Sequence, residues 1–145
     1  ELFNVTFKAA NVPTWHECVK PFDIFDDGKL SGRIYFDLEA RKEKRGGAWM
    51  NDWETHYIDA RGEKHLPSAF VVCNYSPTTD TTPSLLRHDD VVTLFHEMGH
   101  AIHHLFGKCK ERSVSGINGV AWDVVEFPSQ FLENFAYEAA ILKRF

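Results

Sequence analysis

Apolar and polar residues alternate in the first half of the chain, which is typical of β-strands. The clearest signal is the pair Asp27-Gly28, which lies between two apolar-rich runs and favours a tight hairpin turn. In the run that follows the turn, every second residue from Ile34 to Leu38 is apolar. This pattern predicts a β-hairpin with one face against a core.

Two further runs have strand character. Residues 45–50 enter a short apolar stretch through two glycines, and residues 68–76 are rich in β-branched and aromatic side chains up to Pro77. The second run either offers a free edge to an extended peptide or lies inside the sheet; its composition fits both. We therefore expect a small antiparallel β region, with a loop over residues 78–83.

The second half of the chain has helical periodicity. Asp89 or Asp90 can cap a helix that runs to about Phe106, where Gly107 supplies a stop. After a loop, a second helix is expected over residues 129–145, beginning there or up to two turns earlier.

Strands followed by helices predict an α+β fold. The length of 145 residues fits one domain, or one piece of a larger domain, and 43% hydrophobic residues suffice for a buried core. We expect a single domain over residues 1–145, with a β-rich part at 1–88 and a helical part at 89–145.

The composition of the chain argues against several classes of function. A net charge of −5 with no long basic cluster argues against nucleic acid as an obligatory partner. No apolar run approaches the ~18 residues of a membrane span, and the opening residues lack the features of a secretory signal peptide. The three cysteines are widely spaced and odd in number, which is typical of free thiols in a reducing compartment. Cytoplasm is the expected location.

The segment TLFHEMGHAIHH, residues 93–104, holds four of the eight histidines. On a helical wheel with His96 at zero, His100 falls at about 40° and His103 at about −20°. Glu97 and His104 fall at about 80–100°, whereas the apolar residues lie on the far side. The sequence therefore predicts an apolar helix face against the core and a face of imidazoles and one carboxylate opposite.

A solvated helix face normally carries Lys, Arg and Glu, but residues 88–107 contain neither Lys nor Arg. Neutral imidazoles without competing cations suit a bound metal. HEMGH matches the H-E-x-x-H pattern, in which His96 and His100, one turn apart, bind one Zn²⁺. Glu97 lies to one side, where it can take a proton from a zinc-bound water. The pattern predicts metal-assisted hydrolysis.

A catalytic zinc usually has three protein ligands. The metzincin pattern fails because its next positions hold His103 and Phe106. Cys109 is one candidate, although it closely follows the helix stop. Glu126, 26 residues after His100, is the better candidate if a second helix crosses the first. Taken by itself, Glu126 is better explained as a carboxylate favoured by the start of a helix, and it is the upstream H-E-x-x-H pattern that favours a ligand instead.

HEMGHAIHHLF followed by SGINGVAWDVVEFPSQFLENF resembles the thimet oligopeptidase family of zinc peptidases, including its bacterial oligopeptidase A branch. RIYFDLEARKEKRGGAWM is similar to the strand and loop before the active-site helix in that branch. The resemblance implies one zinc ion per chain bound by His96, His100 and Glu126. It also implies that Glu97 is the general base and that short peptides are the substrates.

Other positions carry less weight in the resemblance. The family also has His and Glu at the positions of His103 and Glu133. Two interpretations of these residues stay open: they orient a metal ligand, or they only form hydrogen bonds on a helix surface. Gly116 and Gly119 belong to a loop near the cleft or to an ordinary turn.

Family members are several times longer than this chain. The resemblance therefore implies a zincin-like catalytic core, part of a larger and mainly helical peptidase, with the remainder of the parent polypeptide as a partner. The isolated chain is expected to be weakly active or inactive, because segments that stabilise the transition state are missing. Two alternatives stay open: a zinc-stabilised module without catalysis, and a metal-dependent hydrolase of another amide.

Overall fold

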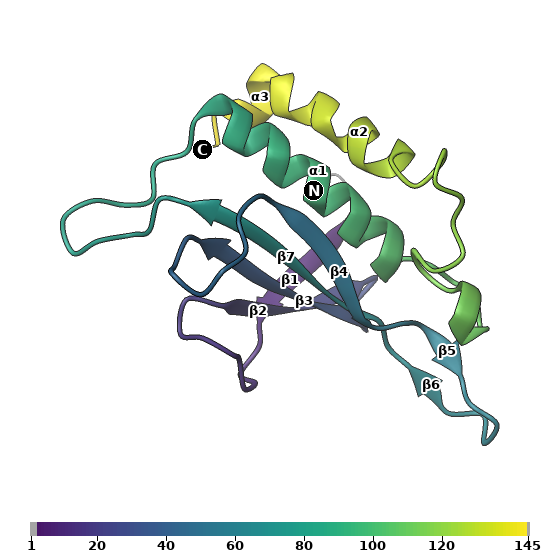
Figure 1. The fold of residues 1–145 in the computed structure, drawn as a ribbon. Coiled ribbons are helices and arrows are strands. Elements are labelled where there is room, and N and C mark those ends of the chain that lie inside the picture. Colours follow the sequence, from purple (N-terminus) through teal and green to yellow (C-terminus); the bar gives the residue numbers. More distant parts are fainter. Residues whose placement is uncertain (1–2, 145) are drawn as a thin grey trace.

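A five-stranded sheet carries one long helix across one of its faces, and shorter helices lie beyond that helix (Figure 1). The computed structural model describes residues 3–144. The strands are β1 (Val5–Ala9), β2 (Lys20–Asp26), β3 (Lys29–Glu39), β4 (Trp49–Glu54), β5 (Tyr57–Ile58), β6 (Lys64–His65) and β7 (Ser68–Tyr75). The helices are α1 (His88–Leu105), the 3₁₀ turn η1 (Arg112–Val114), α2 (Phe127–Glu133), the 3₁₀ turn η2 (Asn134–Tyr137) and α3 (Ala139–Leu142). The expected α+β fold is confirmed.

The strand order is β1-β2-β3-β7-β4. The predicted hairpin joins β2 to β3, and its turn residues Asp27 and Gly28 both have positive φ, at 47° and 74°. The sheet is mixed rather than wholly antiparallel, because β3 and β7 pair in parallel. After β3 the chain forms β4 at the edge and the small β5–β6 hairpin, and it then returns to place β7 between β3 and β4.

Strand β7 is the centre of the core. It pairs with β3 on one side and β4 on the other, and Ala69, Val71 and Cys73 are fully buried. The interpretation of residues 68–76 as a free edge is therefore wrong. A run of buried β-branched residues is typical of an interior strand covered on both faces, and the edge on this side of the sheet belongs to β4.

Helix α1 ends within a residue of the prediction, but its N-cap is Arg87, two residues before the nearer of the two predicted caps, Asp89 and Asp90. The Asp90 carboxylate accepts a hydrogen bond from the Arg87 backbone N–H at 2.8 Å, which satisfies the start of the helix. Ala101 and Leu105 are buried against the sheet. The apolar face of α1 therefore lies on the core as predicted.

The second helix differs from the prediction. It begins at Phe127, consistent with an earlier start, but it is not continuous. Asn134 donates its side-chain amide to the carbonyls of Gln130 and Phe131, and such bonds compete with the helix ladder. The chain then tightens into η2, and Glu138 is extended, with ψ at 119°, before α3. Phe145, the last residue of the predicted helix, lies outside the described residues.

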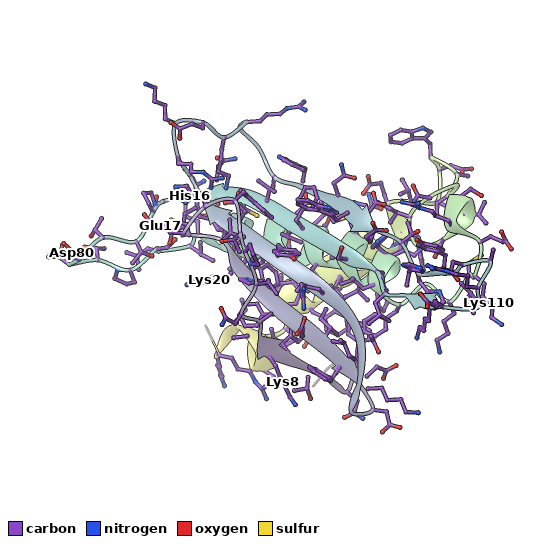
Figure 2. The ribbon with its side chains drawn as sticks, turned by 90° about the horizontal axis from the view of Figure 1, so that it is seen from below. Lys8, His16, Glu17, Lys20, Asp80 and Lys110 are labelled. Atoms are coloured by element: carbon purple, nitrogen blue, oxygen red, sulfur yellow. The ribbon has the colours of Figure 1, made fainter. Side chains whose placement is uncertain are left out.

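Within residues 3–144, no helix covers the face of the sheet opposite α1, as the view from below shows (Figure 2). A buried carboxylate on this face, that of Asp37, accepts hydrogen bonds from the Trp15 indole at 2.9 Å and from Arg41 at 2.6 Å. The Lys44 ammonium also contacts Asp37, and it donates to the carbonyls of Glu39 in β3 and Cys73 in β7. This cluster fixes the loop that leads into the edge strand β4.

Candidate metal centre

Helices α1 and α2 lie side by side (Figure 1), and their contact gathers three of the predicted site residues. His96, His100 and Glu126 each offer a ligand atom, and these atoms all lie within 4.8 Å of one another. The Glu126 Oε2 atom is 3.2 Å from His96 Nε2 and 3.1 Å from His100 Nε2. His100 and Glu126 are thus in contact although they are 26 positions apart in the sequence.

Local structure explains each placement. His96 and His100 are four residues apart on α1, so both rings project from the same side of the helix. Glu126 is the residue immediately before α2, and Pro128 occupies the first turn, where its missing N–H costs no hydrogen bond. Glu126 therefore directly precedes the first turn of α2.

The spacing of the three donors fits zinc. With Zn–N and Zn–O bonds of about 2.0–2.2 Å, two ligands of a tetrahedral ion lie roughly 3.3–3.6 Å apart. The two Glu126–histidine distances, 3.2 and 3.1 Å, are close to that separation. The donor set of two imidazoles and one carboxylate is also that of several catalytic zinc sites. The described residues can therefore hold such an ion with little rearrangement.

Electrostatics favour the protonation states that a metal requires. Burial lowers the pKa of His100, which keeps its imidazole neutral. A hydrogen bond from Ser129 lowers the pKa of Glu126, helped by the nearby imidazoles, and keeps that carboxylate charged. Neutral imidazole and ionised carboxylate are the forms that coordinate a metal.

The two residues predicted to support the ligands behave differently. Glu133, on α2, accepts a hydrogen bond at 2.6 Å from His96 Nδ1, which leaves the Nε2 atom of the same ring facing Glu126. His103 is not in the ligand group, and its Nδ1 atom is buried without a hydrogen-bond partner among the described residues. Burial lowers the pKa of His103. The structure therefore connects Glu133, but not His103, to a candidate ligand.

Glu97 lies beside the ligand group but is not part of it. The backbone of Met50 in β4 lies near enough to the Glu97 carboxylate to lower its pKa slightly, but burial has the larger effect. Only 6% of the residue is exposed. Burial raises the pKa of Glu97, which makes its carboxylate a better proton acceptor than a solvated one.

The histidine face of α1 is more enclosed than its sequence suggested. His104 is fully buried, and its Nε2 atom donates to the Glu54 carbonyl at 2.8 Å, at the end of β4. Gly116, with φ at 64°, packs directly on the His104 ring. His104 therefore joins the end of α1 to β4 and to the following loop, and both Gly116 and Cys109 lie outside the ligand group.

Two contacts near the site were missed by the sequence analysis. The Ser129 hydroxyl lies 2.8 Å from Glu126 Oε2, and the backbone of α2 rests against Gly99 of α1. A glycine in a helix interior costs about 1 kcal/mol relative to alanine, so Gly99 was itself a signal of close helix packing. For Ser129 the available signal was its position three residues after Glu126, on the same side of a helix.

Comparison with known proteins agrees with this geometry. The sequence model of peptidase family M3 matches residues 1–145. Oligopeptidase A of Escherichia coli (strain K12) is 43% identical over 143 residues, which are 97% of this chain and 21% of the relative. The organellar oligopeptidase A of Arabidopsis thaliana is 39% identical over 143 residues, 94% of this chain and 18% of the relative. A dipeptidyl carboxypeptidase of Salmonella typhimurium is 39% identical over 147 residues, 100% of this chain and 21% of the relative.

The chain thus spans about a fifth of the length of these relatives. The alignment with the Escherichia coli relative covers 97% of this chain, and it therefore includes the segment that carries the His96, His100 and Glu126 group. A family match over every residue, together with the site geometry, leads to one conclusion. The chain belongs to peptidase family M3.

Proposed function

We propose that this chain is the zinc-binding catalytic core of an M3 oligopeptidase and that it hydrolyses peptide bonds in short peptides. The M3 family is zinc-dependent. The observation that carries the proposal is the convergence of His96, His100 and Glu126 within 4.8 Å, beside a buried carboxylate that is not one of the donors. The chain is proposed to act as one domain and as part of a longer polypeptide.

In this proposal His96, His100 and Glu126 hold one zinc ion. The ion supplies Lewis acidity toward the scissile carbonyl and the attacking water. Glu97 accepts a proton from that water and passes it to the leaving amine. Glu133 holds the His96 ring in its orientation through its hydrogen bond to Nδ1.

Short peptides are the proposed substrates because the relatives are named oligopeptidases and a dipeptidyl carboxypeptidase. Hydrolysis of another amide is the alternative activity for the same residues. Assays with a panel of peptides separate this alternative from peptidase activity. A purely structural zinc site is less consistent with the donors, because structural sites usually have four protein ligands, commonly including cysteine.

The remainder of a longer M3 polypeptide is the proposed partner. A groove of about 850 Å³ lies between α1 and strands β1–β3, and its lining is largely apolar, with Phe22, Leu94 and Phe106 among the contributors. On α2, Phe127 is 70% and Phe131 53% exposed. Apolar surfaces of this extent usually mark interfaces. We propose that the groove and the exposed phenylalanines of α2 pack against segments that the M3 relatives have outside the part matched by this chain.

Cytoplasm remains the predicted cellular location. One relative from Arabidopsis thaliana is named chloroplastic/mitochondrial and another is named cytosolic, so the family itself does not fix a compartment. Among residues 3–144, no helix is long and apolar enough to cross a membrane.

A substitution that separates metal binding from proton transfer tests the proposal. Glu97→Gln should retain one zinc per chain and lower peptide hydrolysis by about 10²–10⁴-fold. Activity is measured with quenched peptides, with and without chelator, in this chain and in a longer parent. Glu17→Gln, an exposed glutamate on a loop beneath the sheet (Figure 2), is the matched control. Loss of zinc in Glu97→Gln would make Glu97 a ligand and contradict the assigned roles.

A further inference from the structure

The first turn of α2 rests directly on the backbone of α1 at Gly99. A methyl group built at Gly99 would lie 2.5 Å from the Pro128 carbonyl oxygen, 2.5 Å from Ser129 Cα and 2.8 Å from Ser129 N. All three atoms belong to the backbone, so they cannot rotate out of the way. Gly99 lies between His96 and His100 in sequence, so this close contact of the two helices is at the level of the histidine pair.

Ser129 occupies this contact and reaches the candidate ligand. It is fully buried, and its hydroxyl lies 2.8 Å from Glu126 Oε2 and 2.9 Å from the Glu126 carbonyl oxygen. The same Oε2 atom lies 3.2 Å from His96 Nε2 and 3.1 Å from His100 Nε2. The hydroxyl thus holds the particular carboxylate oxygen that faces both imidazoles.

We infer that Gly99 and Ser129 together set the position of Glu126: the bare backbone at Gly99 seats the first turn of α2, and the Ser129 hydroxyl aims the Glu126 carboxylate at the two imidazoles. Both are positioning residues, since neither offers a ligand atom to the candidate group. The inference rests on the proposed function, because it assigns the two residues a role in binding zinc.

The geometry explains why both residues are needed. Glu126 and Ser129 are three positions apart, so their side chains lie on the same side of α2. A side chain at position 99 would push the α2 backbone outward by several tenths of an ångström, and the Glu126 oxygen would move away from both rings. Without the hydroxyl, the helices could still pack, but the partly exposed carboxylate would be free to rotate.

Titration with zinc alone tests the inference, with the affinity measured by competition against a chromophoric chelator. Ser129→Ala should bind zinc about 10–100-fold more weakly than the original chain, the usual effect of losing a partner of a metal ligand. The visible absorption of the cobalt-substituted protein should change as well, while thermal unfolding of the metal-free protein stays within a few degrees. A merely structural role of Ser129 would change the unfolding but not the cobalt spectrum.

Gly99→Ala should weaken zinc binding more than Ser129→Ala does. In an ordinary helix, the same substitution is stabilising. Gly46→Ala is the matched control, because a methyl group there meets no atom within 4 Å. Ser113→Ala, at an exposed serine, is the control for the hydroxyl. Both controls should bind zinc as the original chain does.

The outcomes separate the inference from the proposed function. If the original chain binds no zinc, the proposed function fails, and the inference fails with it. If the original chain binds zinc but Ser129→Ala binds within twofold of it with an unchanged cobalt spectrum, the proposed function survives and the inference is overturned. Should Gly99→Ala fail to fold, the Ser129→Ala result still decides.

Discussion

The carboxylates of Asp37 and Glu126 have contrasting surroundings. Asp37 lies beneath the sheet, where two permanent cations, Arg41 and Lys44, and the Trp15 indole donate hydrogen bonds to it. Glu126 lies between two helices, and its Oε2 atom contacts the imidazoles of His96 and His100 at 3.2 and 3.1 Å. Asp37 is buried, whereas 46% of the Glu126 side chain is exposed.

The difference distinguishes a structural carboxylate from one available to a ligand. Arginine and lysine cannot coordinate a metal while protonated, so Asp37 is committed to holding the loop before β4. Imidazoles that are neutral provide electron pairs instead of charge, and they leave the Glu126 carboxylate free to share a metal with them. Substitutions at Asp37 should therefore change folding stability, and substitutions around Glu126 should change metal affinity.

The largest expected effect is on stability, from Asp37→Asn. Removal of the negative charge leaves the buried Lys44 and the largely buried Arg41 without their counter-charge, which typically costs about 3–5 kcal/mol. Urea unfolding of the metal-free protein measures the loss, and zinc affinity of the folded fraction should be unchanged. Asp80→Asn, at an exposed position on the loop before α1 (Figure 2), is the control. A loss below about 1 kcal/mol would place Asp37 among ordinary surface charges.

Glu126→Gln should have the opposite effects: it should weaken zinc binding and leave folding stability almost unchanged. An amide oxygen is a poor zinc ligand, so zinc affinity should fall by at least ~100-fold, more than is typical for a residue outside the coordination shell. Stability of the metal-free protein should hardly change, because the side chain is half exposed. Zinc titration and urea unfolding are measured on the same samples, with Glu111→Gln as the exposed control. Unchanged affinity would remove Glu126 from the ligand set.

Acid should weaken the Asp37 cluster in a defined range of pH. Burial alone would raise the pKa of Asp37, but hydrogen bonds from Arg41, Trp15 and Lys44 outweigh it and lower the pKa from 3.8 to about 2. The stabilisation is therefore complete above pH 3.8 and is lost as the pH falls through about 2. Its size is on the order of 2 kcal/mol.

The pH prediction is measured as the difference in unfolding free energy between the original chain and Asp37→Asn, both with chelator. The difference should shrink on going from pH 4 toward pH 2, to about half or less of its neutral value. A difference that stays constant over this range would mean that Asp37 titrates normally in the folded protein.

The smallest expected effect is that of Glu133→Gln. The amide can still accept the hydrogen bond from His96 Nδ1, but it no longer carries the charge that strengthens this bond. Zinc affinity should fall by about 10-fold, with no change in the unfolding of the metal-free protein. A fall as large as that for Glu126→Gln would contradict this supporting role and indicate that Glu133 itself binds the metal.

Sequence periodicity was sufficient for the local part of this site. His96, Glu97 and His100 lie within five residues of one helix, and helix geometry alone fixes their relative directions. The β2–β3 hairpin was equally accessible, because Asp27-Gly28 has a strong preference for the observed turn. The candidate third ligand Glu126 depends on the upstream H-E-x-x-H pattern, on the loop length and on the family resemblance, since periodicity by itself favours a helix-entry carboxylate at this position.

The remaining features depend on contacts between distant segments. The parallel pairing of β3 with β7 follows from where the chain returns to the sheet, which no local pattern encodes. The burial of His104 comes from β4 and the Gly116 loop, so a wheel of α1 alone placed it on the open face. The break before α3 lies at the extended residue Glu138, which the helical periodicity of this segment did not indicate.

The most direct measurement is a crystal structure of the zinc-loaded chain, with the metal located by anomalous scattering. The account predicts one zinc ion about 2.0–2.2 Å from Nε2 of His96, Nε2 of His100 and a carboxylate oxygen of Glu126. A second group of possible ligands, Asp59, Glu63 and His65, lies on the β5–β6 hairpin. Zinc bound at that hairpin, with His96 and His100 left paired to Glu126 alone, would contradict the central claim.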